Sequence, residues 1–75
     1  MSKYILNRNK QDSESGDNHE LHNEETCTRL PNHVNRLDVG YFPNCHDAKR
    51  EAKTKYPHMA SDIDGCSYCC SECRN

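Results

Sequence analysis

Six cysteines and five histidines are the feature that most constrains this 75-residue chain. Only 32% of its residues are hydrophobic, and a chain this short buries a smaller fraction of its surface than a larger chain does, so its core must be thin. Ordering the backbone costs about 1 to 2 kcal/mol per residue, which leaves such a core little surplus. The sequence therefore predicts a single domain over residues 1–75 that needs a metal ion or disulfides to stay folded.

The N-terminal sequence indicates the cellular compartment of the protein, and with it the redox state of the cysteines. They contain no apolar run and no small-residue cleavage site of the kind that marks a signal peptide, and no stretch of the chain is apolar enough to span a membrane. We therefore expect a cytoplasmic protein, whose reducing surroundings keep thiols free and favour metal binding by clustered cysteines. A disulfide scaffold is the alternative for a secreted chain.

Local patterns predict a small α+β domain with two or three short antiparallel strands and one main helix. Alternating polar and apolar residues indicate strands at 3–7 and 37–42, residues 17–22 could be a return strand, and residues 60–63 are a further candidate for a last strand. Residues 8–18 are polar and rich in turn formers, which predicts a flexible loop. Asn44 is a helix N-cap with Asp47 three positions on, and Pro57 blocks continuation, so the helix should cover 45–56.

The strongest chemical signal is the sequence Gly65-Cys66-Ser67-Tyr68-Cys69, in which two cysteines at Cys-x-x-Cys spacing can share one ion. His22-x4-Cys27 offers a second pair about forty residues upstream, and a metal stabilises most where it closes a long loop. Mixed nitrogen and thiolate ligation suits Zn²⁺. The predicted ligands of a structural zinc ion are therefore His22, Cys27, Cys66 and Cys69. Four protein ligands leave no open position, so we expect no enzymatic activity at the ion.

Other donors stay open as alternative ligands. Cys73 could fold back over the metal through the Cys70-x-x-Cys73 spacing, and Cys45 lies on the apolar face of the predicted helix, where a small buried hydrophobe is the simpler interpretation. His19 is three residues from His22, so on a strand the two face opposite sides. Cys70 directly follows Cys69 and cannot easily bind the same ion, which predicts a partly buried free thiol.

Several motifs follow one another in a recognisable order: Lys3-Tyr4-Ile5-Leu6-Asn7, His19-Glu20-Leu21-His22 with Cys27, Gly40-Tyr41-Phe42, Cys45-x-x-Ala48, and Asp64-Gly65-Cys66-x-x-Cys69. In this order the chain resembles, over most of its length, a group of short, uncharacterised bacterial and phage proteins. More remotely, its layout is similar to the metal-binding domain of the Ada DNA-repair protein, which ligates zinc with four cysteines. That resemblance implies a zinc site in which His22 and Cys27 take the place of the first cysteine pair. Because that pair differs, the resemblance does not extend to Ada's methyl-accepting nucleophile.

Charge is unevenly distributed along the chain. Lys49, Arg50 and Lys53 make the predicted helix basic, whereas residues 12–25 hold six acidic side chains and no Lys or Arg. Opposite patches of this kind suit a protein partner. We therefore expect an intracellular structural-zinc module that acts through protein–protein interaction, such as a small phage or accessory modulator. A nucleic-acid-binding zinc domain is one alternative, although the net charge is −2 and aromatic residues are few. A thiol redox protein is the other.

Overall fold

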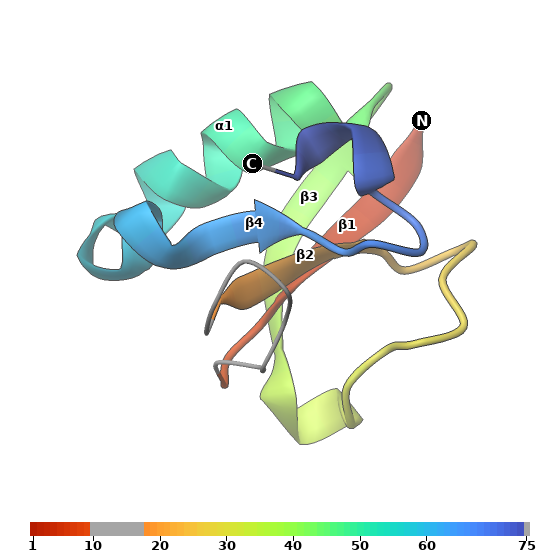
Figure 1. Cartoon of the computed structure of the whole chain (residues 1–75), viewed down its shortest axis with the longest axis horizontal. Helices are drawn as coiled ribbons and strands as arrows, with labels where there is room; N and C mark the ends of the chain where they lie inside the picture. The colour runs from red at the N-terminus through yellow and green to blue at the C-terminus, as the bar shows by residue number, and fades with distance from the viewer. Residues whose placement is uncertain (10–17, 75) are drawn as a thin grey trace.

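The structure, a computed structural model, describes residues 1–9 and 18–74 and consists of a four-stranded sheet with one helix across a face (Figure 1). The elements in chain order are β1 (Ser2–Asn7), β2 (His19–Asn23), the 3-10 turn η1 (His33–Asn35), β3 (Arg36–Phe42), α1 (Cys45–Lys55), η2 (Pro57–Asp62), β4 (Ile63–Gly65) and η3 (Ser71–Cys73). The α+β class predicted from the sequence is confirmed.

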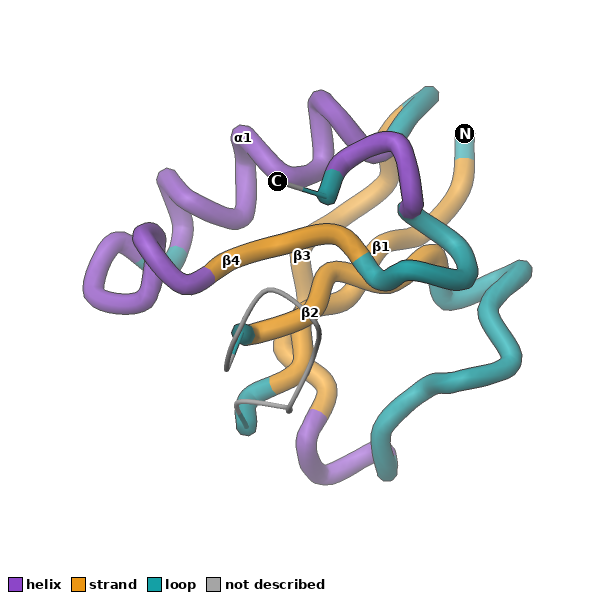
Figure 2. The backbone as a smooth tube through the Cα atoms, viewed as in Figure 1, coloured by secondary structure: helices purple, strands orange, loops and turns teal. Residues whose placement is uncertain are grey.

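The strand order is β3-β1-β2-β4, with β1 antiparallel to β2 and β3 and with β4 parallel to β2. The sequence predicted only two or three antiparallel strands, because local patterns do not show that α1 carries the chain from one sheet edge to the other (Figure 2). The strand predicted at 60–63 is wrong in its bounds, since Pro57 opens a 3-10 turn and the strand begins at Ile63. Most of the predicted loop 8–18, and the start of the strand predicted at 17–22, fall outside the described residues.

The core lies between the sheet and α1. It is built from buried apolar side chains of all four strands and of the inner helix face: Tyr4, Leu6, Leu21, Val39, Ile63, Cys45, Ala48 and Ala52. The helix begins where the sequence predicted, because the Asn44 side chain accepts a hydrogen bond from the Asp47 backbone N–H at 2.9 Å. Within the described ranges, no helix has the length and apolarity needed to cross a bilayer.

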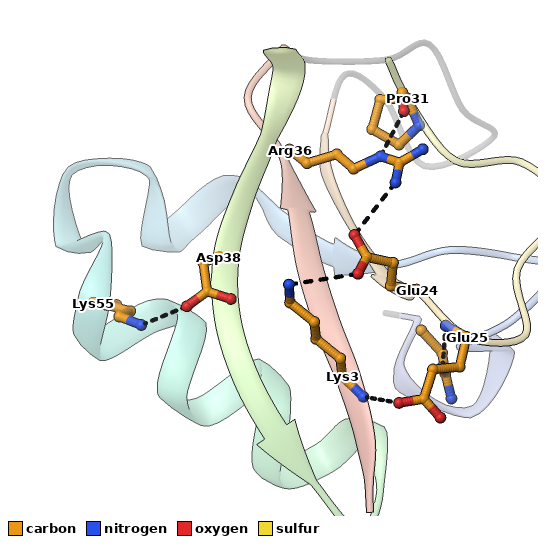
Figure 3. Close-up of polar contacts among 8 residues, drawn as sticks. Lys3, Glu24, Glu25, Pro31, Arg36, Asp38 and Lys55 are labelled. Atoms are coloured by element: carbon orange, nitrogen blue, oxygen red, sulfur yellow. Dashed lines mark hydrogen bonds and ion pairs between the residues drawn. The ribbon is translucent and has the colours of Figure 1, made fainter. Parts of the chain in front are cut away.

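The C-terminal end of α1 is fastened to the edge strand β3. The Tyr56 hydroxyl donates to the Asp38 carbonyl at 2.7 Å, and the Lys55 ammonium donates to the Val39 carbonyl at 3.4 Å. Lys55 also forms an ion pair with the Asp38 carboxylate (Figure 3), at a distance of 3.6 Å. The pairing of β3 with β1 shifts register beside Gly40, whose φ of 129° is one that side-chain-bearing residues rarely adopt.

Candidate metal centre

The structure brings His22, Cys27, Cys66 and Cys69 together, with one donor atom of each within 4.8 Å of the others. The Cys27 sulfur is 3.4 Å from His22 Nδ1 and 3.8 Å from the Cys66 sulfur, and the Cys69 sulfur is 3.9 Å from His22 Nδ1. In a zinc tetrahedron with Zn–S of about 2.3 Å and Zn–N of about 2.0 Å, two sulfurs are about 3.8 Å apart and a sulfur and a nitrogen about 3.5 Å. These three distances are therefore close to the edges of a tetrahedral zinc site.

Strand alternation points the His22 side chain away from the core under α1. Its neighbour Leu21 is part of that core, whereas His22 lies opposite Ile5 in the β1–β2 register and is fully buried. Burial, with a smaller effect from the nearby Arg36 guanidinium, lowers the pKa of His22 to about 4. The imidazole is thus neutral at pH 7, as a metal ligand must be. Among the described residues, its Nε2 atom has no hydrogen-bond partner.

The Cys66–Cys69 turn is positioned by β4. The Cys66 backbone N–H donates to the Leu21 carbonyl of β2 at 2.9 Å, and the Cys70 N–H closes the turn on the Cys66 carbonyl at 2.8 Å. Gly65 makes this turn feasible, because a Cβ at that position would overlap the Cys70 carbonyl oxygen and lie 3.0 Å from the Cys73 Cβ. Gly65 thus lets the chain fold back on its own strand.

A network of ion pairs holds the loop of residues 24–35 that carries Cys27 (Figure 3). Arg36 donates through Nε to the Pro31 carbonyl at 2.8 Å and through Nη1 to the Glu24 carboxylate at 3.3 Å. The same carboxylate lies 3.6 Å from the Lys3 ammonium of β1. Glu24, one of the acidic residues of the stretch 12–25, therefore ties the Cys27 loop to the sheet.

Each of the three cluster sulfurs accepts one backbone N–H. The donors are Asn23 for Cys69 at 3.4 Å, Arg29 for Cys27 at 3.5 Å, and Tyr68 for Cys66 at 3.4 Å. N–H groups aimed at sulfur stabilise thiolates and typically surround metal-bound cysteines. In the absence of an ion, burial raises the pKa of Cys27, and raises that of Cys66 to about 12. Cys27 and Cys66 therefore lack the lowered pKa that a reactive thiol requires, whereas the pKa of the free thiol Cys70 is lowered, chiefly by its hydrogen bond with Cys69.

The alternative ligands lie elsewhere. Cys45 and Cys73 form a disulfide with a Cα–Cα distance of 6.3 Å, and His19 Nδ1 lies 3.0 Å from the Asn7 carbonyl oxygen. The expectation that the thiols stay free is therefore wrong for these two residues, and Cys45 is not a simple buried hydrophobe. The reason is that η3 folds against the start of α1, a contact that no local pattern indicates. The other four cysteines are free in this structure.

The basic face of α1 is only partly available. Lys49 donates to the Cys73 carbonyl at 2.8 Å, lies 3.6 Å from the Asp64 carboxylate, and leaves 14% of its side chain exposed. Arg50 and Lys53 are exposed. Together with His46 and Lys49 they line a shallow depression of about 280 Å³. Of the three partner contacts predicted from the sequence, Lys49 has a structural role that the charge pattern could not reveal.

Two groups among the described residues have donor atoms close enough to hold a metal ion: the four-residue cluster above, and Cys45, His46 and Cys73. Each brings together segments that are far apart in the sequence. Comparisons of the chain with protein-family models, with curated proteins and with solved structures find no significant match.

Proposed function

We propose that the chain is an intracellular structural-zinc module that works by binding another protein. The observation that supports the metal most directly is the match between the donor distances of His22, Cys27 and Cys69 and the edges of a zinc tetrahedron. Three thiolates and one imidazole fill all four positions, which leaves none for a substrate or a reactive water. The ion thus stabilises the fold and takes no part in a reaction.

Zinc content and chelation test the structural role. Protein purified without added metal and with its disulfide intact should carry one zinc per chain by native mass spectrometry. Structural zinc contributes about 10 to 16 kcal/mol in small peptides, which matches or exceeds the stability of a whole domain, so EDTA should abolish the circular dichroism of the fold. Cys66→Ser should lose the ion, whereas Ser67→Ala in the same turn should keep it. A metal-free protein that stays folded in EDTA would overturn the proposal.

The partner surface is the basic face of α1, with Arg50 and Lys53 at its centre. These side chains lie one helical turn apart and line the depression described above. Both are exposed to solvent and do not pack in the core. A basic patch on a chain of net charge −2 favours a local acidic surface on another protein over a long nucleic-acid backbone. Asp47 lies 3.7 Å from Arg50 and Glu72 lies 3.8 Å from His46, so acidic groups interrupt this face and weaken it as a phosphate track.

Binding to two model anions separates the partner classes. A labelled glutamate-rich peptide should bind the zinc-loaded protein, and Lys53→Glu should weaken that binding, whereas Arg8→Glu on another exposed surface should not. Stronger and steeply salt-dependent binding of a DNA or RNA oligonucleotide would favour the nucleic-acid alternative instead. Failure to bind either anion would remove this surface from the proposal and leave the zinc site intact.

A further inference from the structure

The second group of metal donors lies where η3 meets the start of α1. The atoms that Cys45, His46 and Cys73 can offer a metal all lie within 4.8 Å of one another. Beside them, the His46 Nε2 atom is 3.8 Å from a Glu72 carboxylate oxygen. In the structure the two cysteines are joined as a disulfide, so their sulfurs are not available as thiolate ligands. The same residues can therefore form a covalent link or a metal site, but not both at once.

Contacts other than the disulfide hold these donors in place. Lys49 donates to the Cys73 carbonyl at 2.8 Å and so fastens η3 to α1. Cys45 is the first residue of α1, where the positive end of the helix dipole favours a thiolate. If the disulfide is reduced, the two sulfurs therefore remain facing each other. A Cα–Cα distance of 6.3 Å lets side-chain rotation separate them to the roughly 3.8 Å that two thiolates on one zinc ion need.

We propose that Cys45, His46 and Cys73 form a second zinc site that exists only when their disulfide is reduced. A dithiol reductant gives two electrons and two protons to the disulfide, which becomes two thiols, while the reductant closes into its own disulfide. Zn²⁺ then binds both sulfurs and displaces the two thiol protons to solvent. Two thiolates and one imidazole are ligands that zinc accepts, and Glu72 or water completes the tetrahedron.

This site differs from the first one in exposure. The side chains of His46 and Glu72 are 61% and 75% exposed, whereas Cys45, Cys73 and His22 are buried. The second site is thus open to solvent on its His46 side, and the presence of zinc there reports the thiol redox state. Intracellular disulfides are commonly transient, so the reduced form is relevant in the compartment proposed above. The inference does not require that the first cluster holds zinc.

Zinc counting by native mass spectrometry tests the second site. The oxidised protein should bind one zinc ion, and the same protein treated with a phosphine, which cleaves disulfides without supplying a competing thiol, should bind two. The second ion should disappear in reduced His46→Ala. It should remain in reduced His58→Ala, which removes an exposed histidine outside both groups. Because His46 is exposed, its replacement should leave the fold intact.

The outcomes separate the two sites. One zinc ion in both redox states would overturn the second site and leave the first, whereas none when oxidised and one when reduced would support the second and remove the first. A second ion that binds the oxidised protein, that survives His46→Ala, or that is lost in His58→Ala would place the extra zinc elsewhere and overturn the inference.

Discussion

Replacing Gly65 by alanine tests whether the close fold of the C-terminal turn on β4 holds the cluster together. The added methyl group would overlap the Cys70 carbonyl oxygen and lie 3.0 Å from the Cys73 Cβ and 3.1 Å from the Cys73 carbonyl carbon. Two of these three contacts involve backbone atoms, so rotation of a side chain cannot relieve them. The turn that carries Cys69 must instead move away from β4.

Overpacking of this kind costs about 1 to 3 kcal/mol. For a domain of this size a loss of about 2 kcal/mol lowers Tm by roughly 8 to 16 °C. We expect Gly65→Ala to show that fall in a thermal melt of the zinc-loaded, oxidised protein, and to lose zinc to a chromophoric chelator at a lower chelator concentration. Ser67→Ala, an exposed change in the same turn, should behave like the wild type. If Gly65→Ala melted and held zinc as the wild type does, the packing of the turn on β4 could not be what positions the site.

Three further outcomes follow from the same structure. Zinc binding to the first cluster at pH 7 should release about three protons, because burial raises the pKa of Cys27 and of Cys66, the latter to about 12, and the hydrogen bond with Cys70 raises the pKa of Cys69. The lowered pKa of His22 leaves no proton to displace from the imidazole. Affinity should therefore weaken as pH falls, and calorimetry in two buffers of different ionisation enthalpy counts the protons, with two indicating one thiolate fewer. Arg36→Ala should speed zinc loss to EDTA several-fold by freeing the Cys27 loop, and an unchanged rate would show that this loop needs no such anchor. Asn44→Ala should lower the free energy of unfolding by about 1 kcal/mol in chemical denaturation, and Asn44→Asp should restore most of it.

The features that local chemistry determines could be predicted from the sequence. The Asn44 side chain and Pro57 set the two ends of α1, and alternating apolar residues located β1 and β3. The four residues of the metal cluster could also be predicted from the sequence, because Cys-x-x-Cys and His-x4-Cys spacing limits which donors can approach one ion.

The features that depend on contacts between distant segments could not be predicted. The disulfide forms because η3 meets the start of α1, and Lys49 is engaged there by the Cys73 carbonyl. In the sequence this lysine is indistinguishable from the exposed Lys53. The parallel pairing of β4 likewise follows from the path of α1 over the sheet, which the residues of β4 do not encode by themselves.

The attachment of α1 to β3 also bears on how this sheet behaves in a crowded solution. An unpaired strand edge offers its carbonyl and amide groups to other chains, which is a common start of aggregation. Here the carbonyl groups of Asp38 and Val39 are already occupied by Tyr56 and Lys55 from the helix end. At the opposite edge, β4 is only three residues long and offers little template for a further strand. Two carbonyl groups at one border of the sheet are thus unavailable for intermolecular β-pairing, and the other border is too short to offer much of a template.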